Sequence, residues 1–195
     1  MKTSIVISDL LPSEIDRREV IRYAGGGKDL GELGKMLDEC IAEAKSELDY
    51  RVCYREFEIK ALGSLLDLEF SHVRSDSLAK NLSGCKKIIL FAATVGIGID
   101  RLIMKYGKIS PAKGLMMQAL GAERIEALCD AFVSEMEKTG YKMRPRFSPG
   151  YGDLQVDLQK EIFQALAPEK NIGLTISSSC LMSPTKSVTA IIGIM

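Results

Sequence analysis

The sequence is poor in the side chains that build metal sites and hydrolytic active sites. It contains a single histidine, His72, and no two of its five cysteines lie closer than thirteen residues. The paired cysteine spacing of zinc and redox sites is therefore absent, and one histidine leaves little material for a zinc site or a Ser-His-Asp triad. The odd cysteine count argues against a disulfide framework. We interpret the thiols as buried and reduced, at Cys40, Cys53, Cys85, Cys129 and Cys180.

The sequence also lacks a net charge and a long apolar run. Its 26 basic and 26 acidic residues cancel, so the basic excess of a protein that binds nucleic acid or an anionic membrane is missing. No apolar run reaches the length of a membrane span, and residues 1–20 lack the apolar core and cleavage site of a signal peptide. We therefore expect a cytoplasmic protein with no nucleic-acid or membrane partner.

Hydrophobic periodicity and turn residues predict a mixture of helices and strands. Helical spacing or helix start and stop signals mark residues 13–25, 28–48, 72–85, 99–108, 110–140 and 154–168. Strand patterns mark residues 3–11, 50–62 and 86–96, and two further strands are expected around a turn at residues 183–186. The order is not a regular β-α-β alternation, which favours an α+β fold. With no linker or repeat, residues 1–195 are expected to form a single domain.

Individual residues define some of these elements. Ser13 is the expected N-cap of the first helix, and Ser75 or Asp76 is the expected cap of the helix within residues 72–85. The continuous apolar run at residues 86–96 predicts a central buried strand. The longest helix is expected to bury a stripe made of Leu115, Ala119, Ile125, Leu128, Phe132 and Met136.

Gly96, Ile97 and Gly98 follow the apolar strand and open a helix, as in a phosphate-binding loop. In a dinucleotide site a third glycine belongs at position 101, where this chain has Arg101, and no acidic residue can be placed at the expected later strand end. We therefore interpret the two glycines as a tight turn that lets the helix approach the sheet.

The segment RPRFSPGYGDL, residues 144–154, is too irregular for a helix and carries groups that suit binding. Pro145 and Pro149 fix their own backbone angles, and Gly150 lets a ligand approach the backbone. Arg146 offers a planar fork for a carboxylate, and Tyr151 offers a flat ring and a hydroxyl. These parts suit a small zwitterionic ligand with a heterocycle, and the alternative is a structural loop with an exposed arginine.

Two motifs in order resemble the activation domain of cobalamin-dependent methionine synthase, and more closely its small free-standing relatives. The first, Arg-x-x-Pro-Gly-Tyr, is present as Arg146, Pro149, Gly150 and Tyr151. The second, Ser-Cys-Leu-Met-x-Pro-x-Lys-Ser-Val, spans residues 179–188. The likeness is clear over residues 88–195 and implies a mostly antiparallel, twisted sheet with flanking helices.

The resemblance implies that the chain binds S-adenosylmethionine. In the family, the motif arginine meets the carboxylate of the ligand, the loop backbone holds the adenine end, and the tyrosine lies close by. A helical glutamate also contacts the ligand, and Glu126 is the best match here. The implied ligand-binding residues are Glu126, Arg146, Ser148, Pro149, Gly150 and Tyr151. The resemblance implies no catalytic residue and no metal ligand in this chain.

The chain departs from the full-length enzymes at several positions. Residues 152–154, Gly-Asp-Leu, replace their Pro-Ala-Cys-Pro, and Ser177 and Ser178 stand where those enzymes have Thr-Glu. The cobalamin-binding motif Asp-x-His-x-x-Gly is missing, so this chain cannot hold a corrinoid by that route. Cobalamin is therefore expected only through a partner protein.

We expect a reactivation module and not a complete enzyme. It would present S-adenosylmethionine for the reductive methylation of cobalamin in a separate corrinoid protein, such as a methionine synthase without its own activation domain. An electron donor such as flavodoxin would take part. One alternative is a self-contained S-adenosylmethionine-dependent methyltransferase for a small molecule, although we find no convincing base. The other is a non-catalytic binding relative that has lost the ligand.

Overall fold

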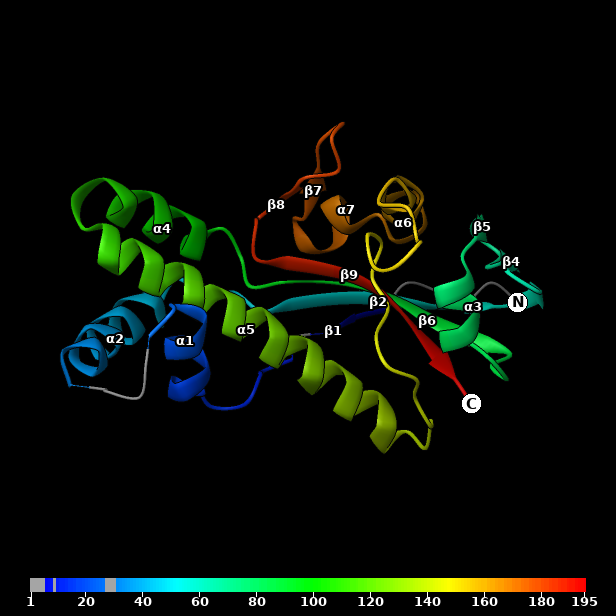
Figure 1. Cartoon of the computed structure of the whole chain (residues 1–195), viewed down its shortest axis with the longest axis horizontal. Coiled ribbons are helices and arrows are strands. Elements are labelled where there is room, and N and C mark those ends of the chain that lie inside the picture. Colours follow the sequence, from blue (N-terminus) through cyan, green and yellow to red (C-terminus); the bar gives the residue numbers. More distant parts are fainter. Residues whose placement is uncertain (1–5, 9, 27–30) are drawn as a thin grey trace.

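A four-stranded antiparallel sheet runs through the centre of the molecule (Figure 1). The computed structural model describes residues 6–8, 10–26 and 31–195. The sheet has the order β1-β2-β6-β9, and its strands are Val6–Ser8 (β1), Arg51–Glu58 (β2), Lys87–Thr94 (β6) and Ser187–Ile194 (β9). Every neighbouring pair in it is antiparallel. The expected α+β fold with a mostly antiparallel sheet and flanking helices is confirmed.

Two small sheets and a set of helices complete the described part of the chain. The small sheets, both antiparallel, are formed by Lys60–Leu62 (β3), Leu65–Asp67 (β4) and His72–Arg74 (β5), and by Thr175–Ile176 (β7) and Met182–Ser183 (β8). The helices are Arg17–Tyr23 (α1), Gly31–Ala44 (α2), Asp76–Asn81 (α3), Gly98–Ile109 (α4), Pro111–Lys138 (α5), Leu158–Leu166 (α6) and Pro168–Ile172 (α7). Within the described residues, no helix is both long and apolar enough to cross a membrane.

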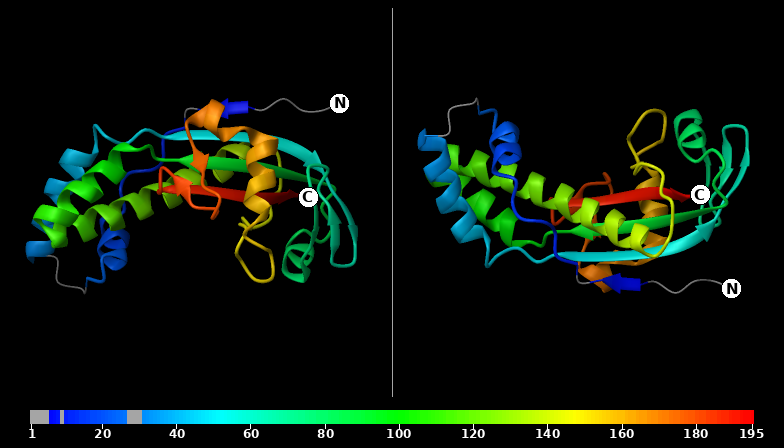
Figure 2. Two further views of the ribbon diagram at one scale, coloured as in Figure 1. Left: turned by 90° about the horizontal axis from the view of Figure 1, so that it is seen from above. Right: turned by 90° about the horizontal axis from the view of Figure 1, so that it is seen from below.

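Both faces of the central sheet are covered, and β6 is buried as a result. Phe91 and the other odd-numbered apolar residues of β6 belong to a core with α1, α2, α4 and α5. Leu90 and the even-numbered ones belong to a second core with α3, α6 and α7. Figure 2 shows α5 on one face of the sheet, with α6 and α7 on the other. A strand buried on both faces is apolar along its length, as residues 88–93 of β6 are, which confirms the central strand predicted from residues 86–96.

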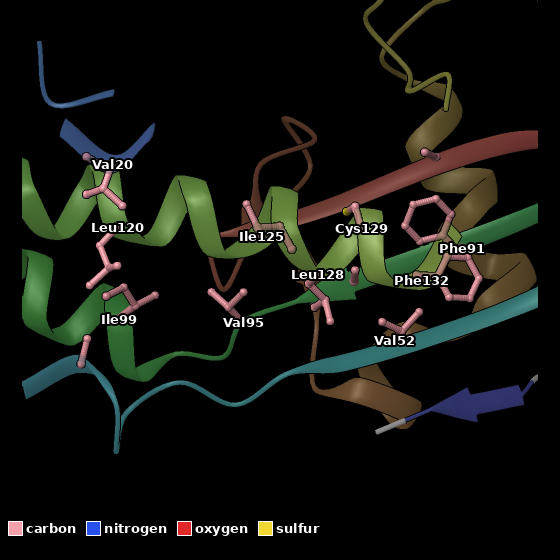
Figure 3. Close-up of a cluster of buried hydrophobic side chains, with 14 of the residues drawn as sticks. Val20, Val52, Phe91, Val95, Ile99, Leu120, Ile125, Leu128, Cys129 and Phe132 are labelled. Atoms are coloured by element: carbon pink, nitrogen blue, oxygen red, sulfur yellow. The ribbon is translucent and has the colours of Figure 1, made fainter. Parts of the chain in front are cut away.

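Helix α5 supplies more residues of the first core than any other element does (Figure 3), and the rings of Phe132 and Phe91 lie 4.8 Å apart there between centroids. Leu115, however, is exposed, so that member of the predicted stripe is wrong. The first turns of α5 pack against α4, where a Cβ on Gly114 would lie 3.0 Å from the backbone nitrogen of Gly107. This close crossing decides which side of those turns is buried. The other predicted stripe residues are buried: Ala119, Ile125, Leu128, Phe132 and Met136.

The N-terminal helices and strand have the predicted type, but their ends differ from the predicted ones. The strand predicted within residues 3–11 is β1, and residues 3–5 and 9 lie outside the described residues. The N-cap of α1 is Asp16 and not Ser13, because the Asp16 carboxylate accepts hydrogen bonds from the N–H groups of Arg18 and Glu19 at 3.0 and 3.2 Å. Helix α2 ends at Ala44, four residues before the predicted end, and residues 28–30 lie outside the described residues.

A buried ion pair on α5 explains why the first helix starts late. The Arg124 guanidinium donates to the carbonyl oxygens of Ser13 and Glu14 at 2.7 and 3.3 Å. The carboxylate of the neighbouring Glu123 accepts from the N–H of Asp16 at 3.1 Å and pairs with Arg124 at 2.5 Å. Residues 13–16 are therefore held against α5 in place of forming a first helical turn.

Several other predicted elements are split into two in the structure, or begin and end at different residues. Residues 50–62 form β2 and β3, which belong to different sheets, because the chain leaves the central sheet at Ile59. Residues 72–85 contain β5 as well as α3, whose cap is Ser75, one of the two expected. Helix α6 begins at Leu158 because residues 154–157 form irregular turns. The C-terminal tail forms three strands, and the turn at residues 183–186 joins β8 to β9 in a different sheet.

The glycines of the Gly96-Ile97-Gly98 turn are explained by close packing. Gly96 has φ +85°, and a Cβ there would lie 2.9 Å from the Cβ of Asp49. A Cβ on Gly98 would lie 2.2 Å from the carbonyl oxygen of Glu47. The turn therefore lets α4 approach the segment that follows α2, and not the sheet as predicted.

The cysteines and the histidine are dispersed over the fold. All five cysteines carry free thiols, and all except the partly exposed Cys85 are buried, which agrees with their interpretation as buried thiols. His72 is exposed, with its Nε2 atom 3.6 Å from a carboxylate oxygen of Asp67. Among the described residues, no three His, Cys, Asp or Glu side chains gather as metal ligands.

Candidate ligand-binding groove

A groove of about 750 Å³ lies along β9, the last strand in the order of the central sheet. Helix α5 and the loop of residues 144–151 line it on one side, and α6, β8 and β9 line the rest. Figure 1 shows this loop, in yellow, leading from the C-terminal end of α5 across to α6. Tyr151 lines the groove and is 68% exposed, so the groove is open to solvent.

The loop is fixed along the outer edge of β9 by backbone hydrogen bonds. Phe147 and Ile191 exchange two of them, N–H to carbonyl in each direction, both at 2.9 Å. The N–H of Arg144 donates to the carbonyl of Gly193 at 2.9 Å, and the Arg144 guanidinium donates to the carbonyl of Ser83 at 2.7 Å. The loop that presents the predicted binding residues is therefore anchored to the sheet.

Asp153 anchors the far end of the loop to the start of α3. Its carboxylate accepts from the Ser75 hydroxyl at 2.5 Å and from the N–H groups of Asp76 and Ser77 at 2.7 and 3.2 Å. The Ser75 hydroxyl, with these N–H groups, lowers the pKa of Asp153 to about 2. Gly152 has φ +55°, and a Cβ there would lie 2.7 Å from the Ser77 hydroxyl. The Gly-Asp pair that departs from the full-length enzymes is thus what lets the loop meet α3.

Arg146 lies between two carboxylates of α5. Its Nη2 atom is 2.8 Å from Oδ1 of Asp130 and 3.1 Å from Oε2 of Glu126. Its side chain is 24% exposed, whereas those of Glu126 and Asp130 are 48% and 72% exposed. Burial lowers the pKa of Arg146, but the nearby Cys129 and the two carboxylates outweigh this and raise the pKa overall. The guanidinium is therefore a fixed positive charge, with two acidic side chains on its solvent side.

The remaining predicted residues form the turn at the end of the loop. Pro149 is buried, and Ser148, Pro149 and Tyr151 all line the groove. Gly150 has φ +93°, its N–H donates to the carbonyl of Leu154 at 2.9 Å, and it does not line the groove. The structure therefore brings together five of the six predicted residues, and Gly150 shapes the turn that carries them.

Some groove residues were missed by reasoning from the sequence. Asp130 stands four residues after Glu126, the spacing that puts two side chains on one face of a helix, so this signal was present. Gln159 of α6 and Thr189 of β9 also line the groove, and nothing in their local sequence marks them. Ser178, at the position of the missing glutamate, is exposed near the tip of the β7–β8 hairpin and does not line the groove.

No protein-family model and no curated protein matches the sequence. Among solved structures, the fold is similar to a crystal structure of the MetH reactivation domain bound to AdoHcy, with a TM-score of 0.65. The match covers 98% of this chain and 78% of that chain, at 16% sequence identity. The chain has the fold of the MetH reactivation domain. This agrees with the resemblance carried by the Arg-x-x-Pro-Gly-Tyr loop, and the match extends to the N-terminal third, where the motifs gave no guidance.

Proposed function

We propose that this chain is a reactivation module. It binds S-adenosylmethionine and presents the methyl group to cobalamin in a separate corrinoid methyltransferase, such as a methionine synthase. The observation that carries the proposal is the position of Arg146 between Glu126 and Asp130, beside an open groove, in the fold of the MetH reactivation domain. The solved domain holds AdoHcy, which is what remains of S-adenosylmethionine after its methyl group is transferred.

The charges of the cluster complement those of the ligand. S-adenosylmethionine carries one negative charge, on its carboxylate, and two positive charges, on its ammonium and sulfonium groups. Arg146 offers one positive charge in a planar fork that suits a carboxylate, and Glu126 and Asp130 offer two negative charges next to it. S-adenosylhomocysteine lacks the sulfonium charge, so we expect it to bind less tightly than S-adenosylmethionine.

The role of this chain in the methyl transfer is to position the ligand. Reduced cobalamin supplies the nucleophile, so the methyl transfer needs no base from the module. The module holds the ligand with its sulfonium methyl outward. The methyl group then meets the cobalt in a fixed orientation, whereas free S-adenosylmethionine would rarely meet it in the right one. The solvent exposure of Tyr151 and Asp130 leaves the cluster within reach of a partner. It also disfavours a self-contained small-molecule methyltransferase, which gains from a site closed to water.

The test mixes this protein with its cognate corrinoid methyltransferase in the inactive cobalt(II) state. Flavodoxin or another reducing system and S-adenosylmethionine complete the mixture. The absorption spectrum should change to that of methylcobalamin only when this protein is present, and Arg146→Ala should slow the change. The partner must be cognate because docking needs a complementary surface that a foreign protein lacks.

Two results would contradict the proposed function and favour one of the alternatives. Ligand binding without any rescue of the cognate partner would favour a binding relative that serves another role. Methylation of a small molecule in the absence of a corrinoid partner would favour a self-contained methyltransferase.

A further inference from the structure

Three side chains that line the groove carry a buried polar atom with no partner: Arg144, Gln159 and Thr189. The atom of Arg144 is Nε of a guanidinium that already bonds the carbonyl of Ser83 through Nη2, so Gln159 and Thr189 are the uncharged members of the set. Gln159 is 8% exposed and Thr189 is 2% exposed, and both line the groove. Among the described residues, none forms a hydrogen bond with Oε1 of Gln159 or Oγ1 of Thr189. A buried polar atom without a partner costs roughly 1–3 kcal/mol, so protein interiors rarely contain one. Finding these two in the lining of one groove points to a ligand that supplies the missing hydrogen bonds.

The backbone of Thr189 points to the same conclusion. Ile191 directs both its N–H and its carbonyl outward from β9, where they bond to Phe147. Residues two apart in a strand direct these groups to the same side, so those of Thr189 also face outward. Within the described residues no partner binds them, because the loop pairs with β9 only from Ile191 onward. The outer edge of β9 is therefore unpaired beside the groove.

Two sets of residues that line the groove differ in charge. The Arg146 cluster with Glu126 and Asp130 is ionic, whereas Gln159 and Thr189 offer a neutral carboxamide and a hydroxyl. S-adenosylmethionine divides in the same way, into a charged amino-acid half with its sulfonium and an uncharged nucleoside half with hydroxyl and amino donors. The ionic groups suit the first half, and the neutral groups suit the second.

We infer that Gln159 and Thr189 bind the nucleoside half of the ligand, an inference that rests on the proposed binding of S-adenosylmethionine. A 120° rotation of χ1 moves the hydroxyl of Thr189 into the position of its methyl group or its hydrogen, and rotation of the terminal torsion exchanges the oxygen and nitrogen of Gln159. Either rotation turns a polar atom toward a different neighbour without moving the backbone. The two residues are thus unsatisfied in the free protein and satisfied by the ribose hydroxyls or the adenine amine.

Calorimetric titration of the full chain with two ligands tests this inference. S-adenosylmethionine has both halves, and 5′-methylthioadenosine has the nucleoside half alone. Thr189→Val and Gln159→Leu should each weaken both ligands by about three- to tenfold, the range for one neutral hydrogen bond. Arg146→Ala should weaken S-adenosylmethionine but leave 5′-methylthioadenosine unchanged.

Thermal unfolding separates binding from a structural role. Thr189→Val keeps the shape of the side chain and removes a hydroxyl that has no partner, so the free variant should melt at the wild-type temperature or above. Ser71→Ala is the matched control, because the Ser71 hydroxyl is also buried without a partner but does not line the groove. It should leave both affinities unchanged.

Several outcomes would overturn the inference. Unchanged affinity for both ligands in Thr189→Val and Gln159→Leu would mean that the atoms bind only water. A loss confined to S-adenosylmethionine would place these residues at the amino-acid half, and a lower melting temperature for Thr189→Val would show a structural role. Wild-type protein that binds neither ligand would remove the proposed function together with the inference. Wild-type binding with unaffected variants would remove the inference alone.

Discussion

Arg146→Ala should weaken the binding of S-adenosylmethionine by about 1–2 kcal/mol. A hydrogen bond between charged groups contributes about 1.5–3 kcal/mol, and the 24% exposure of Arg146 keeps solvent from reducing this strongly. The ligand carboxylate must share the guanidinium with Glu126 and Asp130, however. Ion pairs to side chains as exposed as these contribute about 0–1 kcal/mol. Because the ligand competes with them, this amount is subtracted from the free energy of the bond between Arg146 and the ligand carboxylate. With the middle of each range, about 1–2 kcal/mol remains, which corresponds to a rise in Kd of about 5- to 30-fold.

Isothermal titration calorimetry measures this change, with Arg144→Ala as the comparison. The guanidinium of Arg144 is held on the carbonyl of Ser83, away from the carboxylates of α5. Arg144→Ala should therefore lower the stability of the loop and change the affinity much less than Arg146→Ala. Equal losses of affinity in the two variants would refute the assignment of Arg146 to the ligand carboxylate.

Three further predictions concern stability and are checked by urea unfolding. Arg124→Met should lower the free energy of unfolding by about 3–5 kcal/mol, because Glu123 is left as a buried, unpaired charge; a loss below about 1 kcal/mol would contradict this. Asp153→Asn should destabilise the protein above pH 4. Because the pKa of Asp153 is lowered in the folded state, the difference in stability from wild type should shrink below pH 4 and disappear as the pH falls through about 2. A difference that stays constant over this pH range would contradict the prediction. Gly152→Ala should cost about 1–3 kcal/mol, because it strains a backbone at positive φ and drives a Cβ against Ser77; an unchanged midpoint would contradict this.

The parts of the fold that were predicted correctly depend on local patterns. The apolar run of β6 follows from burial on both faces, and the ends of α5 at Pro111 and Lys138 follow from proline and glycine signals. The loop of residues 144–151 was singled out because its motif residues lie close together in the sequence. Asp130 could have been found with it, since its spacing from Glu126 is helical.

The errors occur where distant segments meet. Ser13 and Asp16 are both competent caps, and the choice between them is made by Arg124, more than a hundred residues away. Leu115 fits the apolar stripe of an isolated helix, but the packing of α4 decides which side of α5 is buried. Gln159 and Thr189 are ordinary residues until the fold buries them without partners, so only the structure reveals them.

The central claim is that the groove beside Arg146 binds S-adenosylmethionine, and a titration of the purified wild-type protein tests it most directly. Heat released with a stoichiometry of one ligand per chain, and a rise in melting temperature that grows with ligand concentration, are the predicted results. S-adenosylhomocysteine should bind at the same stoichiometry but less tightly. No heat and no thermal shift at millimolar S-adenosylmethionine would contradict the claim.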